Sequence, residues 1–217
     1  MTPADLPLAN SLREMAGWNQ TLTDWSRLLA LAPRGCFVAE WGSLSVGTAT
    51  TISYGEQLAW IGMLLVHPDF RGRGIGRALL QRCLDYLHSC GLGCIQLDAT
   101  AQGQPIYERS GFQKEWSLTR WEISRFATPA SANPGQIRSY QPSDIGRIES
   151  LDAKAFGAAR PELLASLLRE SRQGLVHESS DGVDAYGVLR EGARAFYLGP
   201  LAAGSPGTGS SWGSTSA

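Results

Sequence analysis

Hydrophobic residues in the first half of the chain follow two different spacings. Residues 58–66 form a nearly unbroken apolar run, as in a strand that is buried on both faces. From about Gly74 to about Ser89 the apolar positions recur every three or four residues, as on one face of an amphipathic helix. The pattern therefore predicts a buried strand that leads through a short turn into a helix.

Other segments complete the same sheet and its covering helices. Capped helices are predicted over residues 2–15 and from Thr21 to the residues before Pro33. Strands are predicted over residues 36–40, 44–53 and 94–99, a short helix over 104–110, and the last strands within 113–123. This order predicts an α/β fold with a mixed sheet flanked by helices, and it lacks a strand before the first helix.

The second half of the chain repeats the first. Pro142 and Leu151 repeat Pro3 and Leu12, in each case at a distance of 139 positions. A stretch rich in Pro, Ala, Ser and Asn between the halves has the composition of a linker. The expected organisation is a first domain over residues 1–125, a linker over 126–136, a partial second copy over 137–202 and a disordered Gly/Ser tail over 203–217.

Glycine and arginine alternate in the turn between the predicted strand 58–66 and its helix. The sequence there reads Arg71-Gly72-Arg73-Gly74-Ile75-Gly76-Arg77. Glycine lets backbone N–H groups approach a ligand closely, and the first turn of a helix carries unpaired donors and partial positive charge. Arginine adds fixed positive charge. Together these properties indicate a binding site for a pyrophosphate.

The spacing of these residues separates one family of phosphate-binding loops from others. A P-loop needs Gly-Lys-Ser/Thr, and a dinucleotide-binding fold needs G-x-G-x-x-G; this turn has neither. Arg71-x-x-Gly74-x-Gly76 instead resembles the pyrophosphate motif of the GNAT family of acyl-CoA N-acyltransferases. Residues 105–112, which include Tyr107, are similar to a second motif of that family and follow in the same order. The chain thus resembles a tandem GNAT protein with an incomplete second copy.

The resemblance implies the GNAT fold and an acyl-transfer reaction. The expected reaction moves an acetyl group from acetyl-CoA to a primary amine of a small molecule or peptide, without a metal. The alternative is a non-catalytic acyl-CoA-binding or scaffold protein, which the missing first strand and the incomplete second copy favour. Nucleic acid and membranes are not expected partners, because the net charge is −1 and no apolar run approaches the roughly 20 residues of a membrane span.

The resemblance also assigns roles to residues of the first copy. The backbone N–H groups of Leu65 and Val66 would polarise the thioester carbonyl. The turn from Arg71 to Arg77 would hold the pyrophosphate. Tyr107 would protonate the leaving thiolate, since a tyrosine with a pKa of about 10 is protonated at neutral pH. The alternative for Tyr107 is that it packs in the helix or only orients the thiol.

Two carboxylates are candidates for the base that deprotonates the substrate ammonium. Asp98 ends the strand beside the expected donor channel, and Glu56 lies in the turn before residues 58–66. Each has a structural alternative, a helix cap for Asp98 and a solvated turn for Glu56. The family often has Asn seven residues before the tyrosine, where this chain has Thr100. An acceptor pocket, or alternatively the core, would include Trp18, Trp60 and Trp121.

Cysteines and unpaired edges bear on location and partners. The four cysteines, Cys36, Cys83, Cys90 and Cys94, lack a zinc-site spacing and are expected to be reduced, mostly buried thiols. The sequence shows no secretory leader, so a cytoplasmic protein is expected. The missing first strand and the incomplete second copy predict that the two halves pack together within the chain, and a homodimer is a further expectation.

Overall fold

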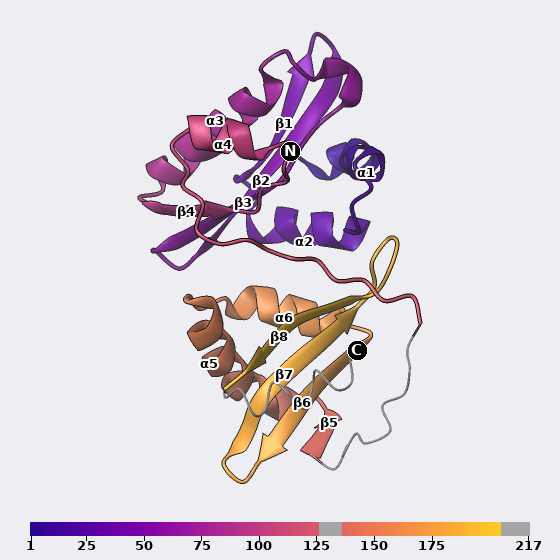
Figure 1. Cartoon of the computed structure of the whole chain (residues 1–217), viewed down its shortest axis with the longest axis vertical. Helices are drawn as coiled ribbons and strands as arrows, with labels where there is room; N and C mark the ends of the chain where they lie inside the picture. The colour runs from indigo at the N-terminus through magenta and orange to yellow at the C-terminus, as the bar shows by residue number, and fades with distance from the viewer. Residues whose placement is uncertain (126–135, 205–217) are drawn as a thin grey trace. The chain divides into compact units, whose positions relative to one another are not determined.

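The computed structural model describes residues 1–125 and 136–204 and divides the chain into two compact units. Unit 1 comprises Met1–Ser117 and unit 2 comprises Leu118–Ala217 (Figure 1). The boundary between the units therefore falls before the predicted end of the first domain at Arg125. The predicted linker except Gln136, and the predicted tail from residue 205, lie outside the described residues.

Most predicted elements of unit 1 are present. In chain order they are η1 (Pro3–Asp5), α1 (Leu6–Met15), α2 (Leu22–Leu31), β1 (Cys36–Trp41), β2 (Leu44–Tyr54), β3 (Leu58–Val66), η2 (Pro68–Phe70), α3 (Ile75–Ser89), β4 (Cys94–Leu97) and α4 (Gln104–Arg109). Sheet A has the order β1-β2-β3-β4, with β3 and β4 parallel and the other neighbours antiparallel. The predicted mixed sheet is confirmed, and β3 has the predicted bounds.

Side-chain capping fixes the start of the first helices. The Thr21 hydroxyl accepts the N–H of Asp24 at 3.3 Å, and the Asp24 carboxylate accepts the N–H of Thr21 at 2.8 Å. This reciprocal pair satisfies two N–H groups that the helix itself leaves unpaired. Thr2 and Asp5 repeat the arrangement before α1, with 2.6 Å from the Thr2 nitrogen to the Asp5 carboxylate. The sequence therefore determines both helix starts locally.

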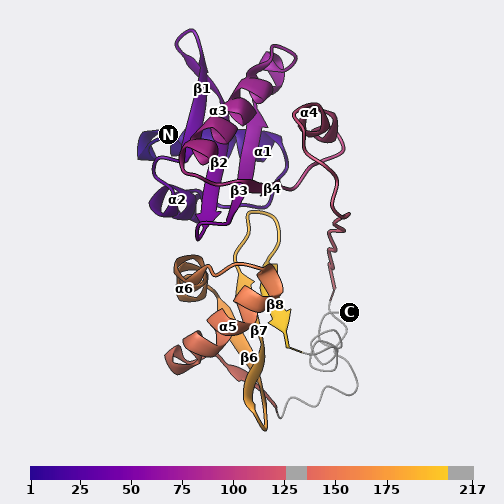
Figure 2. The same cartoon turned by 90° about the vertical axis from the view of Figure 1, so that its left-hand side faces the viewer.

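Helices cover both faces of sheet A. On one face α3 packs on an apolar cluster that includes Val46, Ala59, Ile61, Leu79 and Leu80. On the other face α1 and α2 enclose a second cluster, formed by Ala9, Leu12, Trp25, Met63 and Leu65. Figures 1 and 2 show α3 on the side of the sheet opposite α1 and α2. Each fully buried large side chain of these clusters contributes about 1.5–3 kcal/mol of hydrophobic free energy.

Unit 2 has the same early elements around an antiparallel sheet. They are β5 (Ile137–Ser139), η4 (Pro142–Asp144), α5 (Ile145–Phe156), α6 (Pro161–Arg169), β6 (Gln173–Ser179), β7 (Gly182–Arg190) and β8 (Tyr197–Ala203). Sheet B has the order β5-β6-β7-β8, and its core packs against α5 and α6 around Ile148, Leu164 and Val176. β5 confirms the predicted first strand of the second copy, which unit 1 lacks.

The prediction of strands within residues 113–123 is wrong. The structure assigns no strand there, and the large side chains are exposed: Trp116 by 57%, Leu118 by 66%, Trp121 by 89% and Ile123 by 43%. An apolar pattern shows that a segment is compatible with a strand, but a strand also needs a neighbour to pair with. The core-packing alternative for Trp121 is wrong for the same reason. Among the described residues, no helix is long and apolar enough to cross a membrane.

Candidate active site

Strand β3 runs past the end of its neighbour β4. The two strands pair from Leu58 opposite Cys94 to Ile61 opposite Leu97, where β4 ends. β3 continues to Val66 and is paired there only with β2, on its other side. Within the described residues, the last part of β3 therefore has one edge without a strand partner, and sheet A opens between β3 and β4.

One hydrogen bond fixes the direction of the backbone N–H groups along this open edge. The N–H of His67 donates to the carbonyl of Val46 in β2 at 2.8 Å. Successive N–H groups of a strand point to opposite sides, so those of Val66 and Leu64 point into the opening. By the same alternation the N–H of Leu65 points toward β2. The predicted donor Val66 is well placed, and Leu64 takes the place predicted for Leu65.

A β-bulge shapes β3 beside the opening. Thr48 pairs with Leu65 but Thr50 pairs with Gly62, so β3 has one more residue than β2 over this stretch. Met63 takes a positive φ of 50°. The buried hydroxyls of Thr48 and Thr50 donate to the carbonyls of Met63 and Gly62 at 3.0 and 3.2 Å. The first bond gives a partner to the carbonyl of Met63, which has no residue opposite it on β2, and both bonds hold the strand in this shape.

The turn that follows β3 needs glycine because its backbone takes positive φ angles, and not because a side chain would lack space. Gly72 and Gly74 have φ values of 76° and 81°, while an added Cβ at either residue would meet no atom within 4 Å. Gly74 is the N-cap of α3, so the unpaired N–H groups of the first helical turn lie at this turn. At Gly76 an added Cβ would lie 3.7 Å from side-chain atoms of Leu64 and Val66. The helix start therefore lies directly against the open part of β3.

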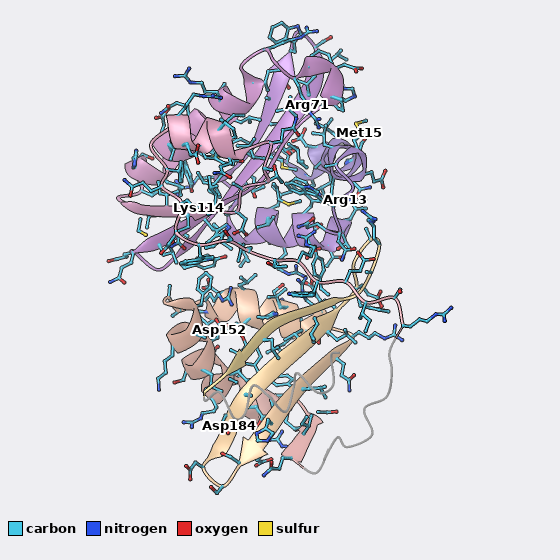
Figure 3. All side chains as sticks on the ribbon, viewed as in Figure 1. Arg13, Met15, Arg71, Lys114, Asp152 and Asp184 are labelled. Carbon is cyan, nitrogen blue, oxygen red and sulfur yellow. The ribbon has the colours of Figure 1, made fainter. Side chains whose placement is uncertain are left out.

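The first two arginines of the turn have different partners. Arg71 Nε donates to the carbonyl of Val66 at 3.1 Å, and Arg71 lies at the end of unit 1 where β3 is followed by α3 (Figure 3). Arg73 Nη2 donates to the carbonyl of Asp69 at 3.2 Å, and its guanidinium lies over two aromatic rings. Arg77 is exposed in the first turn of α3. Arg71 therefore lies beside the opening, whereas Arg73 is turned toward aromatic neighbours.

Tyr107 lies on α4 and packs against the cluster on the α3 side of sheet A. Its ring meets that of Phe112 edge-on at 6.1 Å, and an added Cβ at Gly103 would come within 3.0 Å of it. Burial, and to a lesser extent the neighbouring Cys83, raises the pKa of Tyr107 above its ordinary value of 10.0. Tyr107 is therefore protonated at neutral pH and retains a proton to donate.

The two candidate bases lie at opposite ends of β3. Ile95 and Leu97 pack on the α3 side, so alternation places Gln96 and Asp98 on the α1–α2 side. Asp98 directly follows β4, is exposed, and lies at the opening. Glu56 lies in the turn before β3, roughly 20 Å of extended strand from Leu64. Of the two carboxylates, only Asp98 is close to the opening.

Glu115 is an acid that sequence reasoning missed. Its Oε2 accepts a hydrogen bond from Gln96 Nε2 at 3.0 Å, which places Glu115 on the side of β4 that Asp98 faces. Trp60 lies on this side as well, because its neighbours Ala59 and Ile61 pack on the α3 side. A carboxylate after the second motif has no distinctive sequence signal, because its position depends on pairing with a strand far away in the chain.

Three residues near the motifs and the proposed acceptor side have structural roles. The Thr100 hydroxyl accepts the N–H of Gly103, the N-cap residue of α4, at 3.2 Å. His67 Nδ1 accepts the N–H of Asp69 at 3.3 Å and thereby begins η2. Trp18 packs on the α1–α2 cluster, and its carbonyl accepts a bond from the buried Arg13 at 3.1 Å.

The cysteines do not form a metal site in the part of the chain that the structure describes, where no group of three His, Cys, Asp or Glu could hold a metal ion. Cys36 and Cys83 are buried, and burial raises their pKa values to about 11 and about 12. These thiols are protonated at neutral pH and are poor nucleophiles. Cys90 and Cys94 are free and exposed, contrary to the expectation of mostly buried thiols.

Comparisons with known proteins agree with this geometry. A family profile described as "Acetyltransferase (GNAT) domain" matches residues 32–114, and a second profile of the same description matches residues 148–210. Holothin acyltransferase of a Pseudoalteromonas species is 26% identical over 188 residues, which cover 85% of this chain and 61% of that protein. The uncharacterized N-acetyltransferase YitH of Bacillus subtilis is 26% identical over 148 residues, covering 68% of this chain and 52% of the relative. The chain thus spans little more than half the length of these relatives.

Solved structures share the fold of the chain. A Pyrococcus horikoshii protein assigned as an acetyltransferase superposes with a TM-score of 0.72 at 25% identity, covering 96% of this chain and 71% of that protein. A GCN5-related N-acetyltransferase of Kribbella flavida gives a TM-score of 0.62 at 16% identity, covering 99% and 59%, and shows the fold alone. With one profile match in each half, the chain belongs to the GNAT acetyltransferase family and carries two of its domains in tandem.

Proposed function

We propose that unit 1 is an N-acetyltransferase that moves an acetyl group from acetyl-CoA to the primary amine of a small molecule or peptide. One observation carries the proposal: the open edge of β3 leads directly into a turn of glycines and arginines at the start of α3. The edge offers backbone donors to an acyl group, and the turn offers N–H groups and positive charge to a pyrophosphate.

The residues present fit acetyl-CoA as a co-substrate. When bound, acetyl-CoA supplies a thioester whose carbonyl carbon accepts the amine. The backbone of Gly72–Gly76 with the side chains of Arg71 and Arg77 would hold the pyrophosphate. The N–H groups of Leu64 and Val66 point into the opening and lie about 6.6 Å apart along the strand, so one of them would stabilise negative charge on the thioester oxygen and the other would bind the arm of the donor.

Tyr107 and Asp98 would handle the two protons of the reaction. Asp98 takes a proton from the substrate ammonium, so that the neutral amine nitrogen can form the new N–C bond; as the C–S bond breaks, that nitrogen loses a second proton, which replaces the one that Tyr107 gives to the thiolate. Tyr107 gives its proton to the leaving thiolate; its raised pKa keeps that proton in place until this step.

The acceptor would approach from the α1–α2 side of the sheet. Asp98 and Trp60 face that side, Glu115 is hydrogen-bonded there, and Trp18 packs on its apolar cluster. Carboxylates and aromatic rings attract an ammonium group. The relative named holothin acyltransferase makes holothin a rational first member of an amine panel.

Calorimetry with CoA and a thiol-release assay with acetyl-CoA and amines test the proposal separately. The parent chain should bind CoA and release thiol when a suitable amine is present. Arg71→Glu should weaken CoA binding by at least about 30-fold, because it places a negative charge beside the pyrophosphate. Arg169→Glu, on the exposed end of α6, is the matched control and should bind like the parent.

The second candidate function is acyl-CoA binding without catalysis. It is favoured by Thr100, which stands where the family often has Asn and whose hydroxyl accepts the N–H of Gly103. CoA binding without thiol release across the amine panel would support this candidate, and absence of CoA binding would contradict both. Packing of the two halves and a homodimer stay predictions, for which sedimentation of the chain before and after cleavage near Asn133 is the test.

A further inference from the structure

The turn between β1 and β2 presents large apolar side chains next to the cradle, the glycine–arginine turn of residues 71–77. Trp41 and Leu44 pair across this turn and are 47% and 58% exposed. Because Gly47 pairs with Val66 in the antiparallel β2–β3 pair, the start of β2 lies beside the end of β3. Figures 1 and 2 accordingly show the β1–β2 turn at the same end of unit 1 as the loop between β3 and α3. Two large apolar side chains exposed side by side make this turn a candidate surface for a ligand.

Arg73 joins this turn to the cradle. Its guanidinium carbon lies 5.4 Å from the centre of the Trp41 ring and 5.2 Å from that of Phe70. Its Nη2 donates to the carbonyl of Asp69 at 3.2 Å. The cation therefore lies between a loop aromatic and the indole, while Arg71 turns to Val66 on the side of the opening.

We propose that Trp41 and Arg73 form the stacking site for the adenine end of the acyl donor. The inference rests on the proposed function, which places the pyrophosphate on Gly72–Gly76. The donor continues from its pyrophosphate into a nucleoside with a purine ring and a further phosphate. A partly exposed indole and a planar guanidinium beside the cradle offer that ring a surface to stack on, and the guanidinium offers charge to the phosphate.

Two donors that differ only at the nucleotide end separate this role from a structural one. Acetyl-CoA carries the adenosine part, and S-acetylpantetheine 4′-diphosphate carries the same acyl arm and pyrophosphate without it. Loss of a base-stacking aromatic weakens binding by about 5- to 150-fold. A residue that only braces Arg73 and the turn would affect both donors alike, whereas a stacking residue affects only the donor that has the purine.

The experiment measures the affinity of the full chain for both donors by calorimetry. Trp41→Ala should weaken acetyl-CoA binding by about 5- to 150-fold and leave S-acetylpantetheine 4′-diphosphate binding within about twofold. Trp41→Tyr, which keeps an aromatic face, should recover most of the affinity for acetyl-CoA. Leu44→Ala is the matched control, since it removes an exposed apolar side chain from the same turn without removing a stacking surface, and it should bind both donors like the parent.

Three results would overturn the inference. The first is that Trp41→Ala loses the same affinity for both donors, and the second is that it loses affinity for neither. The third is that Trp41→Tyr binds acetyl-CoA as weakly as Trp41→Ala does. If the proposed function itself is wrong, the result is different: the parent chain binds neither donor. Circular dichroism and thermal melting of each variant confirm that a loss of affinity does not come from unfolding.

Discussion

Units 1 and 2 share a framework and differ in the loop that would bind a ligand. Pro3–Asp5 and Pro142–Asp144 begin corresponding helices, 139 positions apart. Both sheets shift register in corresponding places, at Ala39/Glu40 and His177/Glu178 on one pair of strands and at Thr48/Thr50 and Gly187/Leu189 on the next. Only β3, however, is followed by a glycine–arginine turn and a long helix within the described residues. The bulged sheet is thus a framework, and the loop after it determines whether a site exists.

The same helix position also carries opposite charges in the two units. Arg13 on α1 and Asp152 on α5 are 139 positions apart and both are buried (Figure 3). Asp152 is enclosed by a bidentate ion pair with Arg160 at 2.7 and 2.8 Å and by the hydroxyl of Tyr186. Arg13 binds the Trp18 carbonyl and Asn10, and its Nε has no partner among the described residues. In unit 2 the residue at this position, Asp152, forms a buried ion pair and hydrogen bond within the core. In unit 1 the corresponding Arg13 binds the loop that contains Trp18, on the proposed acceptor side.

Tyr107→Phe should have the largest effect, and only on the chemistry of unit 1. Turnover should fall by about 10²–10⁴-fold with acetyl-CoA affinity unchanged, because only the proton donor is lost. In the parent, the alkaline limb of kcat/KM that Tyr107 controls should lie above pH 10, since its pKa is raised and the phenol donates only while protonated. Equal turnover in the two proteins would reduce Tyr107 to a packing residue.

Asp152→Ala should destabilise unit 2 and leave the donor site intact. Removing one partner of a buried ion pair typically costs about 3–5 kcal/mol, since Arg160 and Tyr186 lose their partner. Denaturant unfolding measures this loss, and calorimetry should show parental CoA affinity. Asp181→Ala, at an exposed turn, is the control. A loss below 1 kcal/mol for Asp152→Ala would show that the pair contributes little.

Gly74→Ala and Gly146→Ala should shift stability in opposite directions. The positive φ of 81° at Gly74 should cost alanine about 1–2 kcal/mol of unfolding free energy and weaken CoA binding as the turn relaxes. Gly146 lies in α5 with no atom near an added Cβ, so alanine there should add about 0.4–1 kcal/mol. If both substitutions changed the free energy of unfolding in the same direction, the positive φ would not explain why residue 74 is a glycine.

The smallest expected signal concerns CoA binding by unit 2. In the full chain carrying Arg71→Glu, any residual saturable binding at high CoA concentration would have to come from elsewhere than the cradle. We expect none, because the described part of unit 2 has no glycine–arginine turn after β8. Weak saturable CoA binding that remains in Arg71→Glu would show that unit 2 also binds CoA, although it lacks the glycine–arginine turn.

Local features of this protein could be predicted from sequence, and non-local pairing could not. The bounds of β3, the Thr21–Asp24 cap and the start of α3 follow from spacing and capping chemistry within a few residues. The prediction of strands within 113–123 was wrong. A strand containing Trp116 or Trp121 needs the edge of a neighbouring strand to pair with, and no local pattern specifies that edge.

The candidate site shows the same limit. The cradle glycines could be identified because their positive φ values are a local demand on the chain. The proposal of Leu64 in place of Leu65 as donor depends on register with β2, and the proposal of Asp98 before Glu56 as base depends on which end of β3 lies at the opening. The stack of Arg73 on Trp41 joins residues from different loops, so only the folded chain brings them together.

The open edge of β3 has a consequence for amide hydrogen exchange. Within residues 1–125 and 136–204, the N–H groups of Leu64 and Val66 have no strand partner, so in the free protein they should exchange with deuterium faster than that of His67, which is bonded to Val46. A bound donor that hydrogen-bonds this edge would slow exchange at alternate residues and leave Leu65 unchanged. That two-residue periodicity would be a signature of the ligand lying along the strand, visible without any acceptor amine.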